Sequence, residues 1–536
     1  YFKTEDELRL FTNQFYNNLV PSAVDIYSES SDLIVKSDLM LEMSGQRIIP
    51  DEGNGWNFTA LRDINFYLQY SHNCTEVNAR NRYDGVARFF RAYFYFEKVK
   101  RYGDIPWYDK ALDSDDPELY KARDSREFVM QKMLEDLDFA IANLPKTKNA
   151  YVLTRWTALA LKSRVCLFEG TFRKYHGLED CEKYLNACVS ASETFMNESG
   201  YTLYKSGSTP YRDLFASINL QADEVIFGRD YEASLSVLHN VQNYENSTTM
   251  GRPGMNKKIV NSYLMADGSF FSSVPGGDKM TFVEECANRD LRLYQTIRTP
   301  GYTRIGSSEV LLPDFDKAST GYQVTKYVTG TDNDASNESV NAIPVFRYSE
   351  VLLNYAEARA ELGVLTQSDL DVSINETRAR AGLPDMQLTD LKVDPAMQKI
   401  YPGISDAAIL EIRRERRIEL AFEGFRWADL MRWRRGPLLA QRFSGMYIPK
   451  MGLQDLDGDG VDDFCVVKNA PDKKEEGITY LILGDNKLLS NGTYGFILPQ
   501  PYTVKTFDEN RDYLYPIPMN ELTINKNLVQ NPGWDY

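Results

Sequence analysis

The first two hundred residues contain a succession of amphipathic helix patterns with only short breaks, and this feature limits the fold most. Thr4 and Glu7 have the spacing of a capping box and open the first pattern. Further patterns follow at about 81–107, 125–143, 154–170 and 178–196. A helix that is apolar on one side must bury that side, and short connections place consecutive helices against each other. The sequence therefore predicts an array of helical hairpins in residues 1–199.

The rest of the chain divides into three regions of different texture. Residues 200–343 are rich in Gly, Ser, Asn, Thr and Pro, with strand-like pieces at 224–227 and 323–328. Helix patterns return in 344–433, at 346–362 and 370–381, and the tail 434–536 is irregular again, with a strand pattern at 478–483. Long irregular segments are usually functional or covering elements. We expect a mainly α fold with long irregular loops and a few short β-strands.

Composition argues against several partners and chemistries. The 61 basic and 77 acidic residues give a net charge of −16, which argues against nucleic acid and against a polybasic membrane contact. The six cysteines form no CxxC motif and have no histidine at metal spacing, so we expect buried thiols. No phosphate loop, nucleophile elbow or histidine-centred triad is present, so none of these motifs indicates catalysis.

The segment DLDGDGVDDFCVV, residues 455–467, carries the most specific local chemistry. A hard cation such as calcium takes about six to eight oxygen ligands, and carboxylates at alternate positions can supply them. The predicted ligands are Asp455, Asp457, Asp459, the Val461 carbonyl and Asp463. An EF-hand would have Glu at the twelfth position, but this position is Val466, inside a predicted strand at 464–467. We predict a structural calcium ion, and the alternative is a solvated acidic turn.

The stretch EIRRERRIELAFEGFRWADLMRW, residues 411–433, combines a helix pattern with dense charge. One interpretation is that Glu415, Glu419 and Glu423 do acid–base chemistry, as in a glycoside hydrolase. Such enzymes need carboxylates on either side of a bond. These three are four positions apart, so they lie along one helix face and do not oppose each other across a cleft.

The other interpretation of this stretch is structural. Arg416 and Glu419 stand three positions apart, as do Glu423 and Arg426, and partners at this spacing can pair along a helix. Gly424 permits a backbone conformation that lets the chain leave the helix. We expect these charges to hold a partly buried scaffold, and we expect Glu423→Ala to lower the melting temperature strongly.

Eight stretches in a fixed order resemble the SusD/RagB family of nutrient-binding outer-membrane lipoproteins of Bacteroidetes. Three of them are ARFFRAYFYFEKVKRYGDIPW at 87–107, RRERRIELAFEGFRWADLMRW at 413–433 and LYPIPMNELTINKNLVQNPGW at 514–534. The others lie at 135–145, 155–170, 288–297, 343–363 and 374–384. The aspartate loop is outside the family's shared core. The resemblance implies one SusD-like unit, 1–536, on a scaffold of tetratricopeptide-like helical hairpins.

The resemblance also implies a function. It implies a non-catalytic protein at the cell surface, held on the outer membrane by a lipidated N-terminal Cys. This Cys is not in the sequence, which begins at Tyr1, so we expect a signal peptide and anchor to have been removed. The implied partner is a SusC-like TonB-dependent transporter, to which the protein delivers an oligosaccharide or, in some members, a peptide.

Aromatic rings and polar side chains in the loops are the candidate ligand contacts. Rings stack on the apolar faces of sugars, while amide and charged groups bind hydroxyls. Most of the 34 Tyr and 27 Phe are expected to pack in the core. The candidates outside it are Arg47, Asn54, Trp56, Tyr70, Asn243, Tyr244, Arg252, Phe270, Phe271 and Tyr302.

Four functions are compatible with these patterns to different degrees. Glycan binding is favoured, and peptide binding in an extended groove is the alternative within the same family. A glycoside hydrolase is disfavoured by the carboxylate spacing. A helical-repeat adaptor is disfavoured because the long loops would obstruct its concave face.

Overall fold

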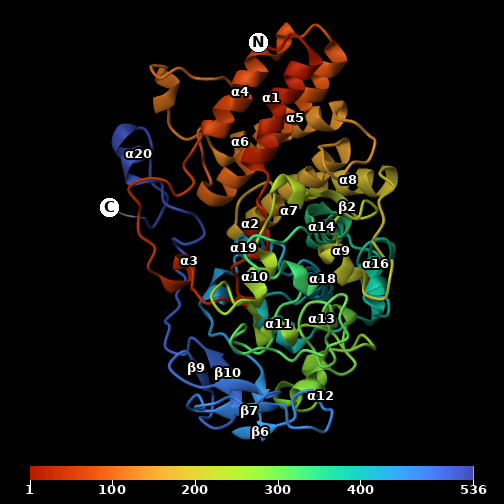
Figure 1. Cartoon of the computed structure of the whole chain (residues 1–536). Helices are drawn as coiled ribbons and strands as arrows, with labels where there is room; N and C mark the ends of the chain where they lie inside the picture. The colour runs from red at the N-terminus through yellow and green to blue at the C-terminus, as the bar shows by residue number, and fades with distance from the viewer. Residues whose placement is uncertain (535–536) are drawn as a thin grey trace.

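The computed structural model describes residues 1–534. Its N-terminal part is a layer of helices that pack as neighbours in sequence order, with α5 against α6 and α7 against α8 (Figure 1). The helices of this layer are α1 (Glu5–Leu19), α4 (Thr59–Tyr70), α5 (Val77–Tyr102), α6 (Arg126–Asn143), α7 (Arg155–His176) and α8 (Cys181–Glu198). The short helices α2 (Ala23–Tyr27) and α3 (Leu41–Ser44) contact residues 241–246 and 436–440 instead. The predicted hairpin array is confirmed.

Side chains at the predicted positions begin these helices. Thr4 forms the full capping box with Glu7 at the start of α1. Ser125 accepts a hydrogen bond from the Phe128 N–H at the start of α6, and Thr154 does the same for Thr157 in α7. Each cap satisfies an N–H group that has no partner inside the helix.

The predicted end of α7 at Gly170 is wrong. The helix continues to His176, and Gly170 lies inside it. A Cβ atom on Gly170 would lie 2.7 Å from Cγ of Leu185 in α8. The glycine therefore allows α7 and α8 to approach each other closely and does not end the helix.

Residues 200–343 form short elements around a core that they share with residues 23–34, 418–422 and 446–497. The helices are α9 (Pro210–Ala216), α10 (Val241–Asn246), α11 (Lys257–Val260), α12 (Phe282–Cys286) and α13 (Leu291–Tyr294). Strand β2 (Val225–Arg229) pairs with β4 (Ile343–Arg347), and β3 (Gly254–Met255) pairs with β1 (Ile34–Val35). The predicted strand at 323–328 forms only isolated bridges, because the chain turns at Tyr327, whose φ is +68°. Buried Tyr, Phe, Val and Ile side chains fill this core.

The third region is helical as predicted. It contains α14 (Tyr348–Glu361), α15 (Gln367–Asp371), α16 (Ile374–Arg380), α17 (Pro395–Ile400), α18 (Ala407–Glu419) and α19 (Arg426–Arg432). The single helix predicted at 370–381 is interrupted at Ser373, which has a non-helical backbone conformation. Helix α18 ends at Glu419, before the predicted exit at Gly424, and both Phe422 and Gly424 have positive φ.

The tail builds two small sheets at the end of the molecule opposite the N-terminal helices (Figure 1). One has β10 (Gly495–Pro499) between β5 (Tyr447–Ile448) and β9 (Lys487–Leu489), all antiparallel. The other has β7 (Phe464–Val467) antiparallel to β6 (Gly452–Gln454) and parallel to β8 (Thr479–Ile482). The chain then returns to the N-terminal helices, where α20 (Met519–Ile524) lies.

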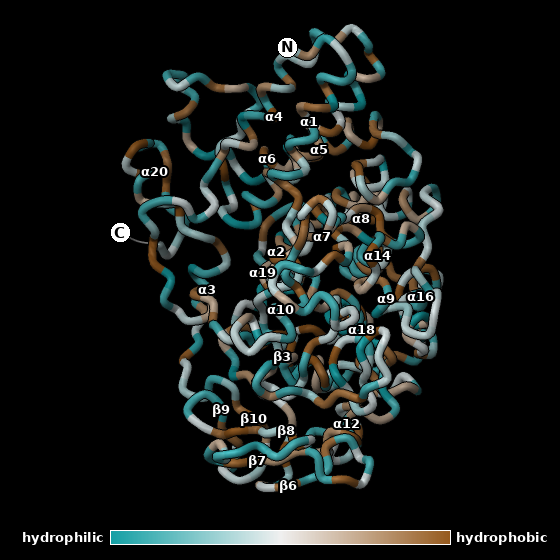
Figure 2. The backbone as a smooth tube through the Cα atoms, in the orientation of Figure 1, coloured by the Kyte–Doolittle hydropathy of each residue, from teal (hydrophilic) through white to brown (hydrophobic). Residues whose placement is uncertain are grey.

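Polar and apolar residues alternate along most segments, as expected of elements that are buried on one side (Figure 2). Across residues 1–534, no helix combines the length and the apolar character needed to cross a membrane. All six cysteines are free thiols; four are buried, and Cys181 and Cys465 are half-buried.

Candidate ligand-binding site

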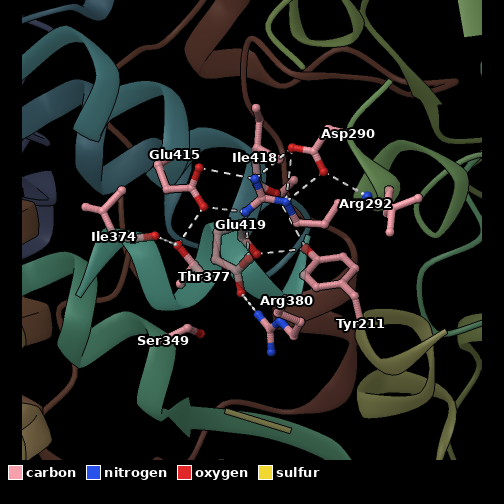
Figure 3. A network of polar contacts seen from close by, with 12 residues as sticks. Tyr211, Asp290, Arg292, Ser349, Ile374, Thr377, Arg380, Glu415, Ile418 and Glu419 are labelled. Carbon is pink, nitrogen blue, oxygen red and sulfur yellow. Dashed lines mark hydrogen bonds and ion pairs between the residues drawn. The ribbon is translucent and has the colours of Figure 1, made fainter. Parts of the chain in front are cut away.

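The charged stretch 411–433 lies in the centre of the protein, as part of a buried ion network. Figure 3 shows Arg292 between Asp290, Glu415 and Glu419. Glu419 accepts hydrogen bonds from Arg292 at 2.9 Å, from Arg347 at 2.7 Å and from Arg380. The Glu419 side chain and its three partners are almost completely inaccessible to solvent.

The ion pairs in this network differ from those predicted along the helix. Arg416 pairs with Asp429 at 2.9 Å and not with Glu419. Glu423 pairs with Lys326 at 2.6 Å, and Arg426 pairs with Asp32 at 2.7 Å. Because α18 is buried on all sides, most of its charges meet partners from other elements, and Arg414 also pairs with Glu411 on the same helix at 3.1 Å.

The network offers no free acid–base pair. Burial alone would raise the pKa of Glu419, but the guanidiniums of Arg380, Arg347 and Arg292 hold it far below its ordinary value. A cavity of about 230 Å³ reaches Glu423 and Asp429. Each of these two carboxylates already binds two basic groups. The geometry is that of a structural network.

A larger cavity, of about 420 Å³, lies between α4, the loop 106–120 and α20. Its wall is mainly aromatic and aliphatic, with a few polar groups among them. The lining residues are Trp56, Phe58, Thr59, Leu61, Arg62, Asn65, Pro106, Tyr108, Lys110, Leu112, Leu119, Tyr120, Glu521, Ile524, Asn525 and Leu528. We call it the aromatic cavity. An apolar wall with a small number of polar groups is typical of small-molecule sites.

The aromatic side of the cavity is held by packing and by one asparagine. Trp56 makes edge contacts with Phe58 and Tyr102, with ring centroids 5.6 and 5.0 Å apart. Asn65 on α4 donates hydrogen bonds to the carbonyls of Tyr108 at 2.9 Å and Lys110 at 3.3 Å. These contacts fix the loop that carries Tyr108 against α4, so the cavity is preformed.

Polar groups with free capacity also line the aromatic cavity. The Arg62 side chain is exposed and makes no salt bridge or hydrogen bond within the part of the chain that the structure describes. Burial raises the pKa of Glu521. Rings, a free guanidinium and a carboxyl group therefore face one space, an arrangement that suits a ligand with apolar faces and hydroxyl groups.

Of the ten ligand residues predicted from sequence, only Trp56 lines this cavity. Asn54 and Arg47 do not line it and make structural contacts instead. Asn54 donates a hydrogen bond to the Pro516 carbonyl at 2.8 Å, and Arg47 pairs with Asp512 at 2.9 Å. Both fasten the segment before α4 to the C-terminal tail. Tyr70 is half-buried against Phe66.

The other predicted residues lie elsewhere in the structure and do not converge. Tyr244, Phe271 and Tyr302 are buried in the cores, so none of them presents a ring to a ligand. Phe270 is half-buried, with Arg414 over its ring. Asn243 and Arg252 are also half-buried and donate to backbone carbonyls. The structure therefore gives these six residues packing or backbone contacts and does not bring them together with Trp56.

Sequence reasoning missed most of the cavity, including Phe58, Tyr108 and Tyr120. Trp56 and Phe58 stand two positions apart just before a helix, and Tyr108 follows the helix-ending segment at 103–106. Aromatic residues that flank helix ends were the available signal. The contribution of α20 has no local signal, because it depends on the return of the tail.

The aspartate loop joins β6 to β7, and β7 has the predicted bounds. Oxygens of Asp455, Asp457, Asp459 and Asp463 all lie within 4.8 Å of one another. Gly458 and Gly460 have φ of +84° and +90°, which only glycine adopts readily. Burial raises the pKa of Asp463, and the negative charges of the neighbouring aspartates raise it further. The hydrogen bond that Asp463 accepts from the Leu456 N–H lowers this pKa by less than burial raises it. Four convergent carboxylates match the oxygen chemistry of a hard cation.

Family comparison classifies the chain. Residues 214–534 match the family described as "SusD family", and residues 47–155 match one described as "Starch-binding associating with outer membrane". The first match covers more than half of the chain and includes α18 and the residues Asp290, Arg292, Arg347 and Arg380 of the buried ion network.

The chain belongs to the SusD family.

Solved structures of SusD-like proteins share this fold over nearly the whole chain. One from Bacteroides fragilis has a TM-score of 0.72 at 22% identity and covers 99% of this chain and 97% of its own. A "SusD-like carbohydrate binding protein" from the same species has a TM-score of 0.75 at 22% identity, over 98% and 99%. "SusD-like protein P2" of Formosa agariphila is 26% identical over 296 residues, so the chain spans about half the length of this curated relative.

Proposed function

We propose that this SusD-family protein binds an oligosaccharide at the cell surface and passes it, chemically unchanged, to a SusC-like TonB-dependent transporter in the outer membrane. The observation that carries the proposal is the aromatic cavity, where Trp56, Tyr108 and Tyr120 surround a space of about 420 Å³ with the free Arg62 guanidinium. The names of the family matched at 47–155 and of one structural relative, which mention starch and carbohydrate, support the ligand class. The family assignment supports the proposed partner and the proposed lipid anchor.

Replacing Tyr120 by alanine is expected to weaken glycan binding by about tenfold or more, because the ring supplies a stacking face. Tyr120 is 45% exposed, so its removal leaves the core intact. Trp56→Ala is expected to act in the same direction. The measurement is calorimetric titration with the oligosaccharide selected from a polysaccharide panel.

Tyr70→Ala is the matched control, since this residue carries a half-buried ring outside the cavity. The Tyr70→Ala variant should bind the selected oligosaccharide as tightly as the unsubstituted protein does. If the Tyr120 and Trp56 variants bound the glycan as tightly as the unsubstituted protein does, the aromatic cavity would not be the binding site. If the protein bound peptides and no glycan, its ligand would be a peptide. Co-purification of the protein with a SusC-like transporter from outer membranes tests the partner.

We also propose that the aspartate loop binds one structural calcium ion through Asp455, Asp457, Asp459, Asp463 and the Val461 carbonyl. Metal-stripped protein is expected to take up one calcium ion per chain in a calorimetric titration, because four carboxylates this close repel one another without a cation. Asp457→Asn should weaken this uptake by at least about tenfold.

Asp462→Asn is the control for the calcium site. Asp462 is exposed in the same loop but is not one of the four converging carboxylates, so its replacement should leave calcium uptake unchanged. Absence of uptake by the unsubstituted protein would identify the loop as a solvated acidic turn.

A further inference from the structure

A second cavity, of about 220 Å³, lies where the chain turns after β10. Residues 498–503 and Lys505 line one side, and Arg442 and Phe443 line another. It shares no residue with the aromatic cavity. Leu488 of β9 and Leu498 and Pro499 of β10 line it, and these strands lie far from α4 (Figure 1).

Lys505 places an ammonium group without a hydrogen-bond acceptor in the wall of this cavity. Its Nζ is shielded from solvent and has no hydrogen-bond partner within residues 1–534, and it contacts the Phe443 ring, 3.2 Å from the ring centroid. The nearby carboxylate of Asp32 is already paired with Arg426 at 2.7 Å. Burial and the like charge of Lys258 lower the pKa of Lys505 to about 7. An anion beside Nζ would relieve this cost of burial.

Gln500 places a free acceptor beside the same cavity. Its Nε2 donates to the carbonyls of Lys36 at 2.9 Å and Ser37 at 3.3 Å, which sets the orientation of the amide. Its Oε1 is then buried without a donor. The φ of Gln500 is +52°, a conformation that non-glycine residues adopt rarely and that often marks ligand sites.

The rim of the cavity adds a charge and a ring. Arg442 is exposed and makes no hydrogen bond or salt bridge in the described part of the chain. Tyr502 is 73% exposed, an unusual setting for an aromatic ring. The cavity thus offers two cations, one acceptor and one ring, and each of them has capacity for a ligand.

We propose that this cavity binds an acidic sugar, with its carboxylate or sulfate group at Lys505 and Arg442. In this arrangement a hydroxyl group of the sugar donates a hydrogen bond to Gln500 Oε1, and the sugar ring stacks on the Tyr502 ring. A neutral sugar would leave the buried ammonium without a partner. An inorganic anion would leave the Gln500 acceptor and the Tyr502 face unused. The chain as a whole has a net charge of −16. The two positive charges at this cavity therefore differ from the average charge of the chain.

The test is calorimetric titration of the whole protein with oligogalacturonate, a sulfated galacto-oligosaccharide, a neutral galacto-oligosaccharide and sodium sulfate. We expect at least one acidic oligosaccharide to bind, at least tenfold more tightly than the neutral one, with an affinity that falls as salt is added. Lys505→Met, which keeps most of the apolar stem, should reduce this affinity at least tenfold. Lys468→Met, a substitution of an exposed lysine outside the cavity, should not.

Tyr502→Ala keeps the test decisive if Lys505→Met does not fold, because Tyr502 is at the surface. It should weaken the acidic oligosaccharide about tenfold and leave any sulfate binding unchanged. Equal affinities for acidic and neutral sugars, or binding of sulfate alone, would overturn the proposal. Trp56→Ala should leave this affinity intact, so failure here is distinguishable from failure of the aromatic cavity.

Discussion

Replacing Glu419 by alanine is expected to lower the free energy of unfolding by about 3 to 5 kcal/mol, because it removes the carboxylate that three buried guanidiniums share and leaves each of them with fewer acceptors. Arg292, Arg347 and Arg380 all donate to this carboxylate, and none of them can reach water. Removing one partner of a buried pair costs more than the pair itself contributes, since an uncompensated charge stays in the interior. Glu423→Ala should act in the same direction through Lys326 and Arg347.

Thermal unfolding followed by circular dichroism measures this effect, and Glu376→Ala is the control. Glu376 pairs with Lys205 at 2.9 Å, but both side chains are about half exposed. An exposed pair contributes at most about 1 kcal/mol, so the control should melt close to the unsubstituted protein. A Glu419 variant that melts like the control would show that the network does not stabilise the fold.

Lowering the pH from 5 to 3 is expected to unfold the protein cooperatively. Although burial opposes the effect, nearby guanidiniums lower the pKa of Glu419, of Glu357 beside Arg432 and of Asp32 beside Arg426. The ordinary values are 4.5 for Glu and 3.8 for Asp. A carboxyl whose pKa is lower in the folded state contributes stability that is complete above its ordinary pKa. This stability is lost as the pH falls towards the folded-state pKa.

Glu29 has the opposite pH dependence. Burial raises its pKa to about 7, although it accepts hydrogen bonds from the Gly424 and Arg426 N–H groups. Its contribution is complete below about pH 4.5 and is lost as the pH rises through 7. The melting temperature should therefore be highest near pH 5, lower at pH 7.5 and much lower at pH 3.

A series of melting curves from pH 3 to 8 measures this profile. Glu29→Gln should reduce the difference between pH 5 and pH 7.5 without changing the acid limb. It should not abolish the difference, because burial also raises the pKa of Glu245. Equal melting temperatures at pH 3 and pH 5 would contradict the role of the buried carboxylates.

Local patterns predicted the helices well because local chemistry sets them. The Thr4 capping box and the strand at 464–467 are where the sequence placed them. Gly170 shows the limit of this reasoning, because a glycine that ends a helix and one that admits a neighbouring helix look the same in sequence. The aspartate loop was predicted residue by residue, since its four carboxylates lie within nine positions.

The ion pairs and the aromatic cavity could not be predicted, because their partners are far apart in the chain. Glu419 lies within reach of Arg416 on its own helix, yet it pairs with arginines from three other segments. Tyr244 and Phe271 looked like loop residues because the middle region has the composition of a loop. Its short helices nevertheless enclose a core, and only tertiary structure separates buried from exposed rings there.

The walls of the aromatic cavity come from opposite ends of the sequence, with Trp56 on one side and Leu528 on the other. A polypeptide made from its N-terminus has every other element available before the last wall exists. The cavity is therefore completed last, after the tail has crossed the molecule to reach α4. Ligand binding then reports that the tail has reached α4, because the same tail supplies both the last wall of the cavity and the buried side chains of Ile517, Leu522 and Leu528.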